Sequence, residues 1–321
     1  MNHGVFCISL DVEKYWGVHD VCSFEEASTF SQVDAITEKM LSLFQRYEIH
    51  ATWATVGLLT YDSIGSLLKE KLEAIPYDNP AYSPFPLYSE VYSKANEMLL
   101  VGLDVLPKII NDPHQEWASH TFSHFYCLEP GVTEVDFKKD CQRMEQIARE
   151  RGHVFKSIVF PRNQVNKDCL NVCADHQYLC YRGNQPNLFW KNSAYSGESF
   201  FKKAGRYIDA YFKFSRTKRF RPDQLENQGG LINIPASRFL RPYSGRPWLE
   251  KRKIRTIKKE MFQAARKKTI YHLWWHPHNF SKTPEIALSQ LEELLAYATV
   301  LHEKFNFQSM NMGEIATYAK S

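Results

Sequence analysis

Residues 5–13 read VFCISLDVE, a short apolar run that ends in two acids. A mostly apolar run of this length indicates a buried strand. Side chains alternate across a strand, so Asp11 and Glu13 are expected to share one face. In parallel α/β folds the active site collects at the carboxyl ends of the strands. The stretch therefore predicts a first strand that delivers two carboxylates to a functional site.

The rest of the chain alternates between helix and strand patterns, which indicates a parallel sheet. Further strands are predicted at 51–57, 157–160, 178–182, 231–234 and 270–275. Helices are predicted at 30–47, 133–150, 166–176, 198–212, 250–267 and 284–304. We predict one α/β domain of barrel type over residues 1–321. Prolines break residues 58–114, which we interpret as an elaborated connection with helices near 60–74 and 89–110.

Composition sets the broad class. The 321 residues are 44% hydrophobic, enough to bury a large core. No apolar run approaches the roughly 18 residues that span a bilayer. The opening residues lack a basic segment and the first apolar run stops at Asp11, so no signal peptide is expected. Seven scattered cysteines, including Cys169 and Cys173, are expected to be reduced thiols in a cytoplasmic protein.

Charge is unevenly placed. The net charge is +4, but residues 213–268 hold 17 Lys and Arg against 4 Asp and Glu. Such a block has two explanations, a solvated helix face or a surface for an anionic partner such as a phosphate, a nucleotide or a membrane.

A histidine pair marks the second candidate site segment. Residues 120–124 read HTFSH, and on a helical turn residues i and i+4 share a face, so His120 and His124 could bind one divalent metal. Chance alone also produces such pairs in a chain with 12 histidines. Other polar residues at predicted strand ends favour the metal site; these are Arg162 after Phe160, and His276 and His278 after Trp275.

Each of these residues also has a structural explanation. Arg162 could be a surface arginine after a turn, and His276 could be a hydrogen-bonded core histidine. The carboxylates of Asp11 and Glu13, on one face, repel each other unless each is neutralised by a cation. A metal bound to one and an arginine paired with the other would remove the repulsion. Asp209 is a further candidate, as an acid that orients a histidine.

Four segments, in this order, resemble the polysaccharide deacetylase family, also called the NodB-homology or carbohydrate esterase family 4 superfamily. They are SLDVE (9–13), SHTFSH (119–124), VFPRN (159–163) and LWWHPHNF (273–280). The similarity is closest to a bacterial branch associated with surface-polysaccharide biosynthesis. It implies a distorted (β/α)7 barrel and one divalent metal, usually Zn²⁺ with Co²⁺, Ni²⁺ or Mn²⁺ as alternatives. It also implies hydrolysis of N-acetyl or related amides.

The resemblance assigns roles by position. Asp11 corresponds to the catalytic base, Arg162 to the arginine that orients it, and His276 to the general acid. The metal ligands it implies are Glu13, His120 and His124. Most members have two adjacent aspartates where this chain has Asp11-Val12-Glu13, and the usual R-x-P-x-Y block reads Pro161-Arg162-Asn163-Gln164, which leaves the oxyanion donor open.

The expected activity is metal-dependent removal of an acyl group from an amino sugar during surface-polysaccharide biosynthesis. The substrate could be linked to a nucleotide or a lipid pyrophosphate, in the cytoplasm or at the inner face of an anionic membrane, and no nucleic acid partner is expected. Two alternatives stay open: hydrolysis of a non-sugar amide, as in allantoinase-like relatives, and an inactive carbohydrate-binding or scaffold protein of the same fold.

Overall fold

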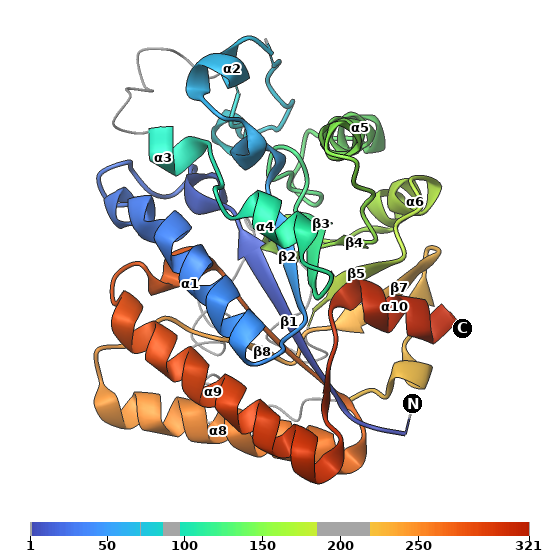
Figure 1. Ribbon diagram of the computed structural model, residues 1–321. Helices are drawn as coiled ribbons and strands as arrows, with labels where there is room; N and C mark the ends of the chain where they lie inside the picture. Colours follow the sequence, from blue (N-terminus) through green and yellow to red (C-terminus); the bar gives the residue numbers. More distant parts are fainter. Residues whose placement is uncertain (1, 71, 86–96, 185–218, 321) are drawn as a thin grey trace.

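The computed structural model describes residues 2–70, 72–85, 97–184 and 219–320 (Figure 1). The helix predicted at 198–212 and the candidate Asp209 lie outside the described residues. Within the described ranges, no helix is both long enough and apolar enough to cross a bilayer.

One curled sheet organises the chain. Its strands follow the order β6-β7-β5-β4-β3-β2-β1-β9-β8, and β10 pairs with the start of β1. All the pairs are parallel except β6 with β7. The strands are β1 Val5–Val12, β2 Ala51–Thr55, β3 Gln115–Ser119, β4 Ser157–Ile158, β5 Cys180–Gly183, β6 Asn227–Gln228, β7 Leu231–Pro235, β8 Arg238–Phe239, β9 Ile270–Trp275 and β10 Gln308–Ser309.

Helices cover the outside of the curled sheet (Figure 1). The helix α1 and the long helices α8 and α9 lie together beside β1 and β9, while α5 and α6 cover the other half. The helices are α1 Val33–Arg46, α2 Ile64–Leu68, α3 Glu97–Leu100, α4 Leu106–Asn111, α5 Glu134–Glu150, α6 Lys167–Asp175, α8 Pro247–Lys267, α9 Pro284–Phe305 and α10 Met312–Lys320. Short 3-10 turns η1 Lys14–Gly17, η6 Pro161–Asn163 and η10 Pro277–Phe280 follow β1, β4 and β9.

The two faces of β1 explain why the site lies inside the sheet. Its even-numbered residues, from Phe6 to Val12, belong to the large core beneath the outer helices. Val5 and Cys7 face the opposite side, where they pack in a smaller cluster with α10. Ser9 and Asp11 continue this inner face toward the carboxyl end of the strand. The inner face thus changes from apolar to polar along the strand, and α10 fills the apolar end.

The α/β architecture of barrel type that the sequence predicts is confirmed, with differences in detail. All the predicted strands at described positions are present, and the sheet gains β3, β6, β8 and β10. Between 58 and 114 the described helices, α2, α3 and α4, are shorter than predicted. The residues 120–124 are not helical, a difference that matters for the site.

Candidate metal centre and active site

Glu13 lies between the two histidines of the HTFSH segment. Its Oε2 atom is 3.1 Å from Nε2 of His120 and 3.0 Å from Nε2 of His124. All three side chains are buried. Gly17 in η1 makes room for the carboxylate, because a Cβ at that position would lie 2.0 Å from Oε1 of Glu13. The three predicted ligands therefore converge on one point at the carboxyl end of β1.

The helical turn expected for His120 and His124 is wrong, although the two rings do meet. The segment is a loop after β3, and Thr121 and His124 adopt left-handed φ values of +63° and +61°. Asp140 of α5 shapes the loop by accepting hydrogen bonds from the backbone N–H groups of Phe122 (2.7 Å) and Ser123 (3.0 Å) and from the Ser123 hydroxyl. Backbone conformations of this kind persist only where the surroundings enforce them. The rings end 5.2 Å apart between centroids.

A hydrogen bond determines how His120 can bind a metal. Its Nδ1 donates to the carbonyl oxygen of Val159 (2.7 Å), so the proton of the neutral ring is assigned to Nδ1. The lone pair of Nε2 then faces the Glu13 carboxylate, and two acceptors 3.1 Å apart need a cation between them. A partner on the second nitrogen is the usual way in which a protein orients a metal-binding histidine.

The ligand set suits a divalent ion of the zinc type. Ligand atoms on one tetrahedral zinc are about 3.3 Å apart, given bond lengths of about 2.0–2.1 Å. Glu13 Oε2 and the two Nε2 atoms have comparable separations, and the three residues qualify as a possible metal-binding group. Burial lowers the pKa of His124 to about 4, so this imidazole is neutral, as a ligand must be, at physiological pH. Only three protein ligands are present in this group, which leaves room for water and substrate.

Arg182 of β5 holds Asp11. Its two terminal nitrogens donate to Oδ1 (2.5 Å) and Oδ2 (2.7 Å) of the carboxylate, and the guanidinium lies 4.1 Å over the ring of Trp274. Asn163 Oδ1 accepts a further hydrogen bond from Arg182 (2.9 Å). Burial alone would raise the pKa of Asp11, but the charge and hydrogen bonds of Arg182 and the neighbouring His120 hold the pKa below its usual value. Asp11 is therefore an ionised carboxylate.

Arg182 thus occupies the place beside Asp11 for which the resemblance implies Arg162. Arg162 donates to Asp20 (2.7 Å to Oδ1) and its guanidinium lies 4.1 Å over the ring of Tyr126. Arg162 and Asn163 both have left-handed backbones, with φ of +53°. The turn sends Arg162 toward Asp20 and Asn163 toward Arg182, so the arginine at the base comes from the next strand. Sequence reasoning missed Arg182, although it lies at the carboxyl end of the predicted strand 178–182.

His276 completes the group from the carboxyl end of β9. Its side chain is partly exposed, and Nε2 lies 3.7 Å from Asp11 Oδ2 and 3.5 Å from Glu13 Oε1. The side-chain amide of Asn279 lies within hydrogen-bond distance of Nδ1 of His276 (3.1 Å). This contact fixes the ring and leaves Nε2 directed into the site.

His278 creates a second possible grouping. The ligand atoms of Glu13, His276 and His278 also lie within 4.8 Å of one another. The ring of His278 is stacked on His276, with centroids 5.0 Å apart, and burial lowers the pKa of His278 to about 3. We favour the first grouping as the metal centre because Glu13 lies 3.1 and 3.0 Å from its two imidazole nitrogens, against 3.5 Å from His276, and because all three residues are buried.

Comparison with known proteins identifies the fold. No family model matches the sequence, and no curated protein matches it. Among solved structures, one from Mycobacterium smegmatis assigned to the polysaccharide deacetylases aligns with TM-score 0.62 and 12% identity over 100% of this chain and 91% of that chain. Another from Pseudomonas aeruginosa PAO1, assigned to the same class, has TM-score 0.58 and 10% identity over 98% and 90% of the two chains.

A third solved structure, Puue allantoinase, aligns with TM-score 0.57 and 11% identity over 98% of this chain and 89% of that chain. At such low identity these alignments establish architecture, and function has to be argued from the site itself. The chain thus has the fold of the polysaccharide deacetylases.

Proposed function

We propose that the protein is a member of the polysaccharide deacetylase family and a metal-dependent hydrolase that removes an acyl group, such as N-acetyl, from an amino sugar. The observation that carries the proposal is the separation of roles between two acids two residues apart. Glu13 faces two imidazoles, whereas Asp11 is paired with an arginine. One acid is thereby suited to bind a metal and the other to accept a proton.

Glu13, His120 and His124 would hold the metal. A bound divalent ion supplies Lewis-acid polarisation of the amide carbonyl and lowers the pKa of water at the site. Burial alone would raise the pKa of Glu13, but His276 and the two HTFSH histidines beside the carboxylate hold this pKa well below its usual value. Glu13 is therefore an anionic ligand that balances part of the charge of the ion.

Asp11 is the general base in this proposal. It accepts a proton from water as the water oxygen attacks the carbonyl carbon of the amide. Arg182 keeps the carboxylate ionised and fixes its plane through two hydrogen bonds. His276, with Nε2 directed into the site and its side chain partly exposed, acts as the imidazolium: it donates the Nε2 proton to the nitrogen of the leaving amine as the carbon–nitrogen bond breaks, and it reverts to the neutral ring.

The surroundings of His276 support the substrate class that we propose. The ring of Phe239 lies 5.5 Å from the ring of His276, and the guanidinium of Arg241 lies 5.8 Å from Phe239. Arg241 thus adjoins the general acid indirectly, through Phe239, and an arginine on this side of the site suits a substrate with a phosphate group, since Arg pairs strongly with phosphate. We therefore propose an N-acylated amino sugar carried on a nucleotide or a lipid pyrophosphate, used in surface-polysaccharide biosynthesis.

The test combines metal analysis with product release. Purified protein is expected to hold one divalent ion per chain, to lose activity with a chelator and to recover it with Zn²⁺ or Co²⁺. Acetate release would be measured over nucleotide-linked, lipid-linked and free N-acetylated amino sugars. Allantoin belongs in the same panel, because the fold also resembles an allantoinase. Hydrolysis of allantoin without any sugar substrate would replace the sugar proposal by the second candidate function.

A further inference from the structure

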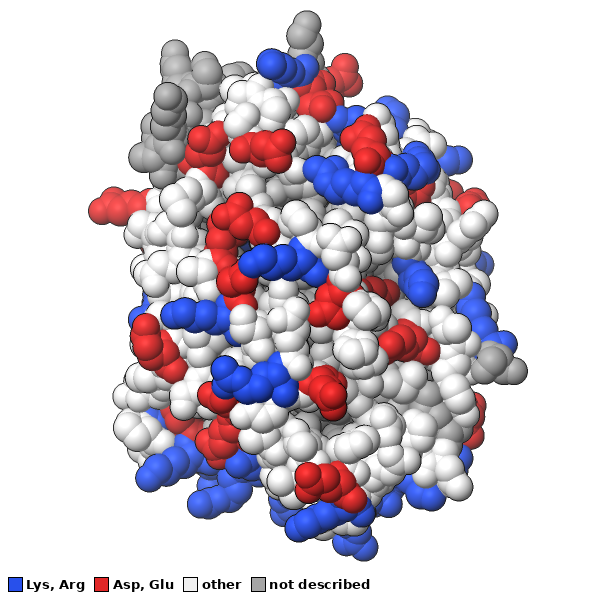
Figure 2. Space-filling model, viewed as in Figure 1, with Lys and Arg blue, Asp and Glu red and all other residues white. Residues whose placement is uncertain are grey.

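The helix α8 carries a row of exposed basic side chains. Lys251, Arg252, Arg255, Lys259, Arg266 and Lys267 are exposed. With 3.6 residues per turn, the first five fall within an arc of about 100°, and 21 residues extend about 30 Å. Figure 2 shows blue side chains gathered along the lower edge of the molecule, where α8 lies in Figure 1. We call this arc the α8 basic face.

The acids of α8 do not neutralise this face, because both are turned inward. Glu250 is buried and pairs with Lys253 (2.5 Å), and Glu260 is buried and pairs with Arg238 (2.6 Å). At the border of the face, Lys258 pairs with Glu293 of α9. Within the part of the chain that the structure describes, no acid lies within ion-pair distance of the residues Lys251, Arg255 and Lys259 on the face itself. The exposed charge of α8 is therefore entirely positive.

A tryptophan lies at the N-terminal end of the α8 basic face. Trp248 is 58% exposed in the first turn of α8, whereas Trp16, Trp53, Trp117, Trp274 and Trp275 are all buried. An exposed indole costs solvation, and tryptophan is the residue that proteins favour at the boundary between water and a bilayer. This places an apolar anchor beside the cations Lys251 and Arg252.

We propose that the α8 basic face docks the protein onto an anionic lipid surface, with Trp248 inserted at the headgroup level. From Lys251 to Arg266 the row of cations is about 22 Å long and can face a flat surface with all its charges. Each basic residue near an anionic bilayer adds to the attraction. Single-stranded nucleic acid is a poorer fit, because its binding sites interleave several aromatic rings with the cations. Here Trp248 is the one aromatic side chain among the exposed residues of the arc.

The position of α8 in the barrel means that docking would place the membrane near the active site. The helix connects β8 to the parallel strand β9, so its first turn lies at the end of the barrel that holds His276. A membrane against α8 would bring lipid headgroups near that rim. The docking itself goes beyond the proposed hydrolysis and needs neither metal nor substrate.

Vesicle binding tests the inference directly. The full chain would be sedimented with phosphatidylcholine vesicles and with vesicles containing about a third phosphatidylglycerol. We expect binding to the anionic vesicles, at least tenfold weaker binding to the neutral ones, and loss of binding as salt rises. The variant Lys251→Glu/Arg255→Glu/Lys259→Glu is expected to lose at least tenfold in partitioning. Lys138→Glu/Lys139→Glu/Lys167→Glu, with the same charge change on α5 and α6, is expected to bind as the parent does.

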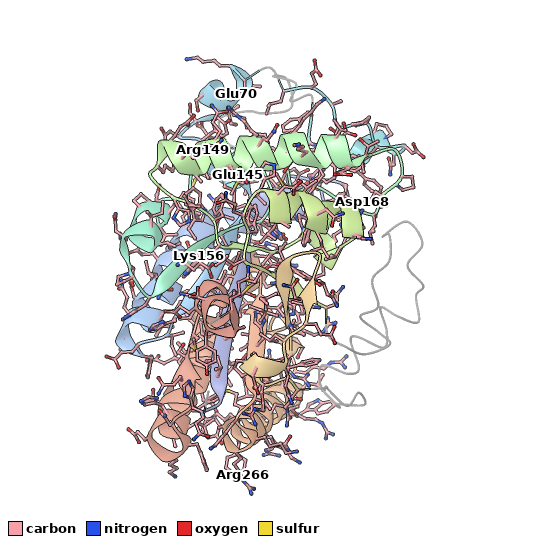
Figure 3. The ribbon with its side chains drawn as sticks, turned by 90° about the vertical axis from the view of Figure 1, so that its right-hand side faces the viewer. Glu70, Glu145, Arg149, Lys156, Asp168 and Arg266 are labelled. Carbon is pink, nitrogen blue, oxygen red and sulfur yellow. The ribbon has the colours of Figure 1, made fainter. Side chains whose placement is uncertain are left out.

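The control helices are well separated from α8. In Figure 3, Glu145 and Arg149 of α5 lie at the opposite end of the molecule from Arg266 of α8. Circular dichroism and metal content, unchanged in both triple variants, would exclude misfolding. Brominated lipids should quench tryptophan emission, and Trp248→Phe should abolish most of this quenching.

Three results would overturn the docking proposal. These are equal partitioning of the parent onto neutral and anionic vesicles, wild-type binding by the α8 triple variant, and quenching that survives in Trp248→Phe. Binding to polyuridylate without binding to vesicles would reassign the face to nucleic acid. Acetate-release activity measured on soluble substrates keeps this outcome separate from the fate of the proposed hydrolysis.

Discussion

Arg182 and Asp11, 171 positions apart in the chain, form a buried ion pair with two hydrogen bonds at the centre of the site. We expect Arg182→Lys to lower kcat by about 10²-fold, because lysine offers a point charge and cannot hold both carboxylate oxygens in one plane. KM should change little, since substrate binding is not the lost interaction. Steady-state kinetics on the substrate identified by acetate release measures both.

Arg162→Lys is the matched comparison for Arg182→Lys. Arg162 pairs with Asp20 and lies over Tyr126, whereas Arg182 pairs with the base. The fold-decrease in kcat is expected to be several times smaller in Arg162→Lys than in Arg182→Lys. Equal losses in the two variants would contradict the assignment of Arg182 as the residue that positions Asp11.

Asp11→Asn should separate catalysis from metal binding. The amide cannot accept the proton of the attacking water, so turnover is expected to fall by about 10²–10⁴-fold. Metal content, measured by inductively coupled plasma mass spectrometry, should stay near one ion per chain, because Glu13 and the two histidines remain. If activity and metal disappear together, Asp11 is itself a ligand.

The metal ligands can be distinguished from His278 by stoichiometry. His120→Asn and His124→Asn should each reduce zinc affinity by at least tenfold, since each removes one of three ligands. His278→Asn should retain one ion per chain with nearly unchanged affinity. A stoichiometry of two in the parent, reduced to one in His278→Asn, would instead support a second ion at Glu13, His276 and His278.

Sequence patterns predict those parts of the site that depend on local geometry. The period of two along a strand places Asp11 and Glu13 on one side, and the structure directs both toward His276. Strand alternation likewise predicts the positions of β1, β2, β5, β7 and β9 in a parallel sheet. These predictions succeed because each depends on neighbours a few residues away in the chain.

Contacts between distant segments could not be predicted in this way. The HTFSH histidines converge because Asp140 binds the backbone N–H groups of Phe122 and Ser123, which are 18 and 17 positions away in the chain. The spacing of residues along a helix cannot predict such a contact. Which arginine reaches Asp11 depends on the direction of the Pro161–Asn163 turn, set by two left-handed residues. Either Arg162 or Arg182 has the right chemistry, and only the backbone path decides between them.

Asp140 should make stability depend on pH. Burial is the main reason that the pKa of Asp140 rises from 3.8 to about 6, against the hydrogen bonds from Ser123 and Phe122 that favour the ionised form. The folded state therefore binds this proton more tightly than the unfolded state does, so unfolding releases it between about pH 4 and pH 6. The contribution of Asp140 to the free energy of unfolding is most favourable below about pH 4, falls by about 3 kcal/mol as pH rises to about 6, and is constant above that.

Urea titrations at a series of pH values measure this contribution as a difference between proteins. The amide of Asp140→Asn does not titrate. The free energy of unfolding, plotted against pH, should therefore have a more positive slope between about pH 4 and pH 6 than in the parent. The variant should also bind metal less tightly, because an amide nitrogen next to the N–H of Ser123 replaces an acceptor and loosens the loop before His124. Glu134→Gln, at an exposed position of the same helix, should leave the slope and the metal affinity unchanged. Identical slopes for the parent and Asp140→Asn would show that this carboxyl group titrates alike in the folded and unfolded chains, and unchanged metal affinity in the variant would show that the HTFSH loop does not depend on this acid.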